Sequence, residues 1–276
     1  MSDLKKRKSG SKGKFNLLSV LLILIGMICI GASVIGIGGI LAEYQKAVDK
    51  YNDLEDEFVS IHKPNQEKPS DTSEKEENTA TEEEAPWYTL ATVNLAGMQA
   101  KYPDIKGWIL FENEDISYPI LKGENNDTYL RTTYDGKKAT AGSIFIEAKN
   151  RDDFMDAHTI LYGHNMKNLS MFGKLNYYKR DESYYETHQY FQIFRGNEIL
   201  RYQIFSYQEV EETSYVYSER HTSARALGTR LSSTSQVNAG ITFTDNDKII
   251  TLSTCTSDDD YRFIVSAVLV DVHVIE

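Results

Sequence analysis

The chain is poor in cysteine, with only Cys29 and Cys255 among its 276 residues. Cys29 lies inside a long apolar run, so we expect no disulfide between the two. Two cysteines and scattered histidines do not provide the ligand spacing of a zinc site, and we expect neither a metal nor another cofactor. Outside the apolar run Cys255 is therefore a lone thiol, which is either an inert buried residue or a reactive one.

A basic stripe is also missing. The formal net charge is −11 at pH 7, and residues 43–86 alone hold fourteen Asp or Glu against five Lys. The exception is the N-terminal region, because residues 1–42 contain six Lys or Arg against one Asp. An acidic body without a basic stripe argues against nucleic acid as a partner.

Residues 15–42 contain no charged side chain, and this segment is long enough to cross a hydrocarbon core of roughly 30 Å. The apolar stretch exceeds the hydrophobic region of a signal peptide, and Gly31-Ala32-Ser33 is a weak cleavage site, so we interpret the segment as an uncleaved anchor that contacts membrane lipid. The positive-inside rule places the basic tail, residues 1–14, in the cytoplasm and the chain after residue 42 outside the cell membrane.

Residues 43–86 are predicted to form a juxtamembrane helix followed by a disordered acidic stalk. Apolar side chains recur at spacings of three and four, which indicates a short amphipathic helix that extends the membrane helix. These side chains are Tyr44, Val48, Tyr51, Leu54 and Phe58. Residues 62–86 contain almost nothing apolar, so they cannot offset the entropy of ordering and are expected to act as a spacer.

From Trp87 onward the chain has a globular composition, and we expect the folded domain over residues 87–276. A helix is predicted at 88–101, and short β-rich runs separated by turn residues follow it. These runs cover 107–111, 116–121, 142–147, 158–162, 190–194, 198–207, 248–254 and 262–275. Their regular spacing indicates an all-β barrel or sandwich. Further helices are predicted at about 170–178, 182–188 and 218–233.

The last two predicted strands flank a chemical signal. The apolar run 249–254 ends at Cys255, and Arg262 opens the next strand after a polar turn. A nucleophile at a strand end is held rigidly at the rim of a fold, and an Arg on the neighbouring strand can stabilise a thiolate and an oxyanion. Within the turn, Asp258, Asp259 and Asp260 offer carboxylates to a cation, but we interpret them as a solvated turn.

A second strand-to-loop transition contains His164, which follows the apolar run 159–162 and Gly163. Among the six histidines it is the one placed as Cys255 is placed, at the exit of a hydrophobic strand. A lone histidine is usually structural, but together with a lone Cys and a nearby Arg we interpret it as the proton-transfer partner of Cys255. The resting protonation of the pair stays open.

The combination of TLSTC (Thr251–Cys255), an Arg seven residues after that Cys and an upstream YGH (Tyr162–His164) resembles the sortase family. Blocks such as NNDTYL (Asn125–Leu130) and AGSIFIE (Ala141–Glu147) make residues 87–276 most similar to class B. The resemblance implies a mainly β fold: a closed eight-stranded β-barrel with an N-terminal helical extension and an inserted helix before the Cys strand, behind a single transmembrane helix.

The resemblance also implies a reaction. Such cysteine transpeptidases cut the C-terminal sorting signal of a surface protein after a Thr, hold the acyl group as a thioester and transfer it to an amine of the peptidoglycan. Carried over by motif, the catalytic residues are Cys255, His164 and Arg262. The residues implied to line the sorting-signal groove are Asn126, Leu130 and Ser253, with Tyr215 and Val216 matched more loosely. The class B pattern implies a signal of the N/S-P-x-T type.

Two alternatives remain open. The first is a pilin-polymerising sortase, in which a pilin lysine attacks the thioester. We favour wall anchoring, because residues 84–87 do not form the acidic-aromatic lid sequence of class C and no membrane helix follows the last predicted strand. The second is a non-catalytic, membrane-tethered binding module, which predicts that Cys255 shows no thiol reactivity.

Overall fold

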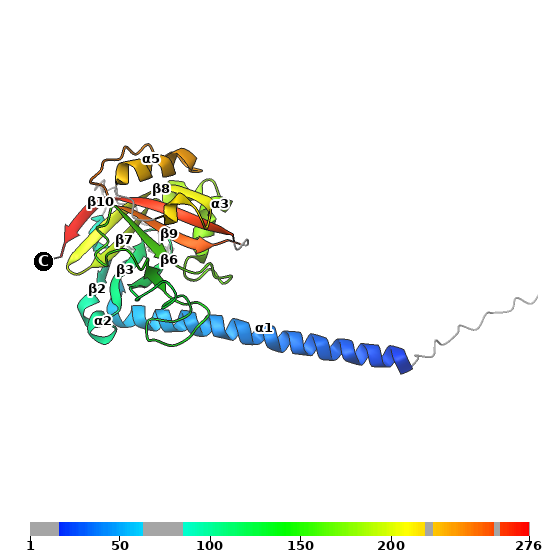
Figure 1. The fold of residues 1–276 in the computed structure, drawn as a ribbon. Helices are drawn as coiled ribbons and strands as arrows, with labels where there is room; N and C mark the ends of the chain where they lie inside the picture. Colours follow the sequence, from blue (N-terminus) through cyan, green and yellow to red (C-terminus); the bar gives the residue numbers. More distant parts are fainter. Residues whose placement is uncertain (1–16, 63–84, 219–222, 257–259, 276) are drawn as a thin grey trace, which may run out of the picture. The chain divides into compact units, whose positions relative to one another are not determined.

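The computed structural model describes residues 17–62, 85–218, 223–256 and 260–275 (Figure 1). The chain divides into two separately packed units, the first ending at Gln45 and the second beginning at Lys46. The predicted cytoplasmic tail, residues 1–14, and nearly all of the predicted stalk lie outside the described residues.

Helix α1 (Leu17–Phe58) contains the apolar segment predicted to be the anchor. Among the described residues it is the one helix that is long and apolar enough to cross a membrane. The amphipathic residues 44–58 belong to the same helix, which confirms the prediction that they extend the apolar segment. A charge-free run followed by a run with apolar residues on one face thus produces one uninterrupted helix with two different surfaces.

Eight strands close into a barrel, as predicted. They are β3 (Ile105–Phe111), β4 (Ser117–Leu121), β5 (Ile144–Ile146), β6 (His158–Tyr162), β7 (Tyr190–Arg195), β8 (Glu198–Glu211), β9 (Ile249–Cys255) and β10 (Tyr261–Val274). Their order around the barrel is β10-β8-β7-β3-β4-β5-β6-β9. The pairs β4–β5 and β6–β9 are parallel, and the others are antiparallel. The parallel β6–β9 pair makes both strands end at the same rim of the barrel.

Short helices connect the strands: η2 (Gly173–Asn176), α3 (Tyr177–Arg180), α4 (Tyr184–Thr187), η3 (Tyr215–Tyr217) and α5 (Ala224–Thr234). Several of them are shorter than the helices predicted from the sequence. The inserted helix was predicted to begin at residue 218 but begins at Ala224, because the side chain of Ser223 caps it by accepting from the amide of Ala226. Helix α5 lies over β8 and β10 (Figure 1), and its Leu227 and Leu231 pack in the cluster that contains Phe205.

The helix predicted over 88–101 is wrong in its first half. The structure contains η1 (Trp87–Thr89), β2 (Ala91–Val93) and then α2 (Leu95–Lys101). Strand β2 forms because its residues pair antiparallel with β1 (Val59–Ile61). Asn94 then starts the helix, since its side chain accepts from the amide of Gly97.

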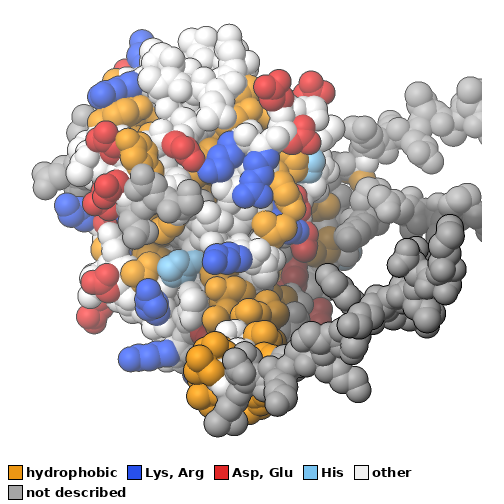
Figure 2. Space-filling view, turned by 90° about the vertical axis from the view of Figure 1, so that its right-hand side faces the viewer, with side chains coloured by type: hydrophobic (Ala, Val, Ile, Leu, Met, Phe, Trp, Pro, Cys, Tyr) orange, Lys and Arg blue, Asp and Glu red, His pale blue; other side chains and the backbone are white. Residues whose placement is uncertain are grey.

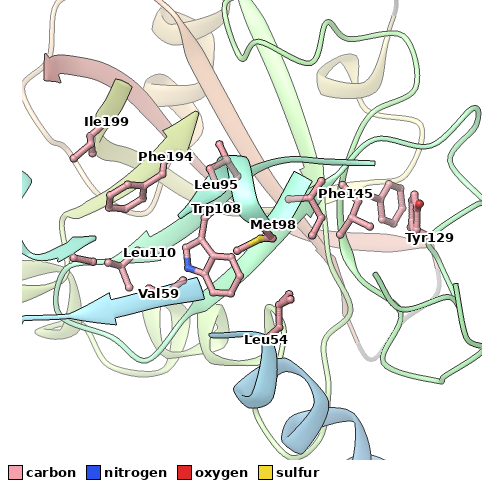
Figure 3. Packing of buried hydrophobic residues seen from close by; sticks show 13 residues of the cluster. Leu54, Val59, Leu95, Met98, Trp108, Leu110, Tyr129, Phe145, Phe194 and Ile199 are labelled. Atoms are coloured by element: carbon pink, nitrogen blue, oxygen red, sulfur yellow. The ribbon is translucent and has the colours of Figure 1, made fainter. Parts of the chain in front are cut away.

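The packed barrel unit begins before residue 87, where we expected the domain to start. Figure 3 shows Leu54 of α1 and Val59 of β1 in one cluster with Met98 of α2 and Trp108 of β3. These side chains are buried, so residues 46–61 supply part of the barrel's core. The amphipathic spacing that predicted the juxtamembrane helix is therefore the pattern of a helix that packs on the barrel.

Candidate active site

Cys255 is the last residue of β9, and its position there sets its exposure. Residues 249–254 are buried, whereas Cys255 itself is exposed and carries a free thiol. In the antiparallel pairing of β9 with β10, the direct partner of Cys255 is Arg262. Neighbouring strands lie about 4.8 Å apart, so the predicted nucleophile and the predicted cation occupy adjacent positions at the rim.

His164 reaches the same rim through the parallel pairing of β6 with β9. Tyr162 pairs with Ser253, and the amide of Gly163 donates to the carbonyl of Ser253 at 3.1 Å. His164 and Cys255 each lie two residues beyond this pair. The position leaves little room for a side chain, because a Cβ on Gly163 would lie 2.4 Å from the terminal carbon of Ile144 and 2.6 Å from a ring carbon of Phe172.

The loop after β6 is hydrogen-bonded to the backbone of Cys255, the candidate nucleophile. The Nδ2 of Asn165 donates to the carbonyl of Cys255 at 2.8 Å, and the side chain of Asn176 donates to Oδ1 of Asn165 at 2.8 Å. The amide of Phe172 also donates to the carbonyl of His164 at 3.0 Å. Asn165 was not identified from the sequence, although it directly follows the candidate histidine.

The ring of His164 has a defined partner. Its Nε2 lies 2.6 Å from the carbonyl oxygen of Leu130. A carbonyl only accepts hydrogen bonds, so Nε2 carries a proton in this contact, and in the neutral ring Nδ1 is the basic nitrogen. The loop that contains Leu130 thus selects one orientation of the imidazole.

Arg262 is oriented by two oxygen atoms. Its Nη1 donates to the carbonyl of Tyr261 at 2.9 Å, and its Nη2 donates to Oε2 of Glu212 at 2.9 Å. Glu212 follows β8, the other neighbour of β10. This ion pair is partly exposed, so its main effect is to orient the guanidinium rather than to stabilise the fold.

Tyr217 is a site residue that the sequence did not reveal. Its hydroxyl lies 2.8 Å from Oγ of Ser253, and its ring stacks on Tyr162 with centroids 6.4 Å apart. Burial raises the pKa of Tyr217 to about 12; Ser253 and Arg262 act to lower it, and Cys255 acts to raise it. The contact with Ser253, two residues before Cys255, places Tyr217 beside the strand that ends at the candidate nucleophile. In the sequence, the one indication of Tyr217 was that it directly follows Tyr215 and Val216, which were matched loosely to the groove.

Two of the predicted groove residues belong to the loop between β4 and β5. Leu130 is 39% exposed and holds His164 through its carbonyl. The amide side chain of Asn126 donates to Oε2 of Glu147 and accepts from the amide of Ala148, each at 2.8 Å. Tyr162 donates to the same Glu147 oxygen at 2.9 Å. Glu147, also missed from the sequence, therefore links this loop to β6.

The other three predicted groove residues are less accessible. Ser253 is 1% exposed and faces Tyr217, so Tyr217 covers it. Val216 is fully buried in the cluster that contains Leu227 of α5, and its assignment to the groove stays a prediction. Tyr215 lies beneath the guanidinium of Arg230, 3.5 Å from the ring centroid.

The electrostatic surface at this end of the barrel is mixed. Figure 2 views the molecule from the side of Figure 1 on which β9 ends, and it shows acidic, basic and hydrophobic side chains interspersed over the described residues. Within the described ranges, no group of three or more His, Cys, Asp or Glu side chains is arranged to hold a metal ion. The chemistry available at this site is that of a thiol, an imidazole and a guanidinium.

Comparisons with known proteins identify the family of the chain. A model of the sortase domain matches residues 111–270. Sortase B of Listeria monocytogenes is 34% identical over 171 residues, which cover 61% of this chain and 69% of that protein. The structure of sortase B from Bacillus anthracis matches with a TM-score of 0.65 and 25% identity over 84% of this chain and 99% of the other. A Streptococcus pyogenes class B sortase involved in pilus biogenesis matches with a TM-score of 0.58 and 26% identity, over 64% and 98%.

The closed barrel and its thiol-bearing rim thus define a β-barrel cysteine transpeptidase. The chain belongs to the sortase family, and the relatives it matches are class B sortases.

Proposed function

We propose that this enzyme cleaves the C-terminal sorting signal of surface proteins, of the N/S-P-x-T type, after its Thr and transfers the protein to a peptidoglycan amine. The observation that carries the proposal is the placement of Cys255. It is exposed at the end of a buried strand, with Arg262 as its direct β-partner and the His164 loop bonded to its carbonyl. A rigid nucleophile with a cation and a proton carrier at the same rim suits acyl transfer.

In the first half of the reaction, Cys255 gives its thiol proton to Nδ1 of His164, and the resulting thiolate attacks the carbonyl carbon of the signal's Thr. The new C–S bond places negative charge on the former carbonyl oxygen, which Arg262 stabilises. His164 gives a proton to the leaving nitrogen, the C–N bond breaks, and a thioester remains on Cys255. With Nε2 bonded to Leu130, Nδ1 is the ring nitrogen that moves this proton.

In the second half, a wall amine attacks the thioester carbonyl. The C–S bond breaks, the amide bond forms, and the amine's proton passes to His164 or the departing sulfur. The groove that binds the signal runs along Leu130 and Asn126, and its wall is formed by Tyr217, which covers Ser253. Tyr215 lies at its outer edge.

We also propose that residues 15–42 anchor the enzyme in the cell membrane as a single span. The basic tail, residues 1–14, lies in the cytoplasm, and the barrel lies outside the cell. Support comes from the apolar part of α1 and from the charge difference across it.

Two experiments test the proposal: one removes the thiol of Cys255, and the other identifies the amine that accepts the acyl group. Cys255→Ala should abolish cleavage of a sorting-signal peptide while circular dichroism shows an unchanged fold. Turnover by the folded variant would refute the role of Cys255. Mass spectrometry should then identify the products when wild-type enzyme receives a peptide-signal library together with wall-stem amines and pilin lysines. Transfer only to a pilin lysine would favour the pilin-polymerising alternative, which the Streptococcus pyogenes relative keeps open.

A further inference from the structure

The loop between β4 and β5, residues 122–143, connects two distant parts of the enzyme. Near its middle the carbonyl of Leu130 binds Nε2 of His164 at 2.6 Å. Near its end the loop contacts helix α1, in the part of the helix that packs within the barrel unit. The orientation of the catalytic imidazole therefore depends on what holds this loop.

Tyr51 of α1 is the closest attachment of the helix to this loop. Its side chain is 2% exposed, and its hydroxyl donates to the carbonyl of Gly142 at 2.6 Å. The same hydroxyl lies 2.9 Å from Oγ of Ser143, which in turn donates to the carbonyl of Thr132. The ring of Tyr51 also packs edge-on against Tyr134 within the loop. One buried phenol thus contacts the loop at Tyr134 and again at Gly142 and Ser143.

Lys50, the residue before Tyr51, binds the loop at Tyr134 and Asp135. Its ammonium lies 2.9 Å from both carboxylate oxygens of Asp135, and its carbonyl accepts from the hydroxyl of Tyr134 at 3.1 Å. Lys50 and Asp135 are 19% and 16% exposed, so the pair is shielded from most of the solvent. Two consecutive helix residues therefore fix the position of the loop.

Gly142 links the position of the loop to His164, because it packs against the carbonyl of Leu130. Its backbone adopts φ +55°, and a Cβ at its position would lie 2.4 Å from the carbonyl oxygen of Leu130. That oxygen is the atom that binds His164. The peptide held by Tyr51 is thus in van der Waals contact with the acceptor that orients the imidazole, in a close-packed interior that transmits small shifts.

We propose that Tyr51 is a positioning residue for His164, acting through Gly142 and Leu130. The inference rests on the proposed role of His164 in proton transfer. Without the phenol, the carbonyl of Gly142 loses its buried donor, and the loop relaxes away from the imidazole. The ring of His164 then samples other orientations, so the proton-transfer step slows while the peptide still binds. Tyr51 touches neither substrate nor reacting atoms.

The test compares Tyr51→Phe with Tyr185→Phe in the full chain, purified in detergent micelles. Tyr185 is a matched control, because its buried hydroxyl also donates to a backbone carbonyl, that of Ile204 at 2.8 Å, away from His164. We expect Tyr51→Phe to lower kcat for peptide cleavage about tenfold, since a 1 Å misplacement can cost roughly a hundredfold. KM should change by less than about twofold, and the control should keep the wild-type kcat.

Ring ¹⁵N chemical shifts of His164 provide a readout that a purely structural role would not move. Wild type and Tyr185→Phe should share the signature of a proton fixed on Nε2, and Tyr51→Phe should lose it. Gly142→Ala, which displaces the carbonyl of Leu130 directly, should lower kcat further. The inference is overturned if Tyr51→Phe matches the control in kcat and in ¹⁵N shifts. A fully active His164→Ala would instead overturn the proposed function.

Discussion

Arg262 occupies the position opposite Cys255 on β10, and its guanidinium is planar and permanently charged. The contacts to Glu212 and to the carbonyl of Tyr261 fix the plane of the group. A group held in this way needs little reorganisation when charge develops on a substrate oxygen. We therefore expect Arg262 to stabilise the transition state more than it stabilises the bound substrate, so that its loss lowers kcat more than it raises KM.

Arg262→Lys should lower kcat for peptide cleavage by about 10²–10³, the usual cost of losing an oxyanion donor, and raise KM much less. Lysine retains the charge but lacks the planar fork by which Arg262 bonds Glu212 and the carbonyl of Tyr261 at the same time. Steady-state kinetics on a sorting-signal peptide provide the measurement. Glu212→Gln, which keeps Arg262, is the control and should cost less. A defect confined to KM would reassign Arg262 to substrate binding.

At the level of elements, α1 is joined to the barrel by charge as well as by apolar contacts. Burial by itself would raise the pKa of Asp135, but hydrogen bonds from Thr133 and Lys50, with Lys137 nearby, lower it well below its usual value. A carboxyl with a lowered pKa in the folded state stabilises that state above its unfolded pKa of about 3.9. The stabilisation disappears as the pH falls through the lowered folded pKa.

Asp135→Asn should therefore reduce the free energy of unfolding by about 1–3 kcal/mol at pH 7. Below about pH 4 the wild type begins to lose this contribution, and it loses all of it only below the lowered folded pKa, so the difference between the two proteins should shrink progressively as the pH falls. Chemical denaturation of both proteins at pH 7 and pH 3 measures this. Glu57→Gln removes an exposed ion pair between α1 and Lys101 and should have little effect at either pH. A difference that stays constant with pH would contradict the ionic explanation.

The sequence predicted those elements whose residues alone carry the signal, such as an apolar run bounded by turn residues. The eight barrel strands were predicted correctly because turn residues separate each apolar run from the next. Cys255, His164 and Arg262 were singled out because each lies at a strand end, and the structure brings these strand ends to one rim. Strand β2 was missed because three residues read as helix unless their partner, β1, is known. Tyr217 and Glu147 were missed for the same physical reason, since their partners lie far away in sequence.

At the scale of the whole molecule, the chain contains an apolar unit that ends at Gln45 and a barrel unit that begins at Lys46. The barrel unit includes the last part of α1, whose Tyr51 and Leu54 are buried, and β1, whose Val59 is buried. Burying one large apolar side chain stabilises a fold by about 1.5–3 kcal/mol. Three such side chains approach the whole stability of an ordinary domain, roughly 5–15 kcal/mol.

Two truncated proteins test this division. A protein that begins at Glu43 lacks the proposed anchor but keeps the barrel unit, so it should leave the membrane fraction, unfold cooperatively and cleave sorting-signal peptide at the full chain's rate. A protein that begins at Trp87 lacks Tyr51, Leu54 and Val59, so it should melt at a much lower temperature or fail to fold, with a matching loss of activity. Thermal unfolding followed by circular dichroism, together with kcat/KM, distinguishes the two. Equal stability of both proteins would return the domain boundary to residue 87, and membrane retention of the protein from Glu43 would contradict the anchor.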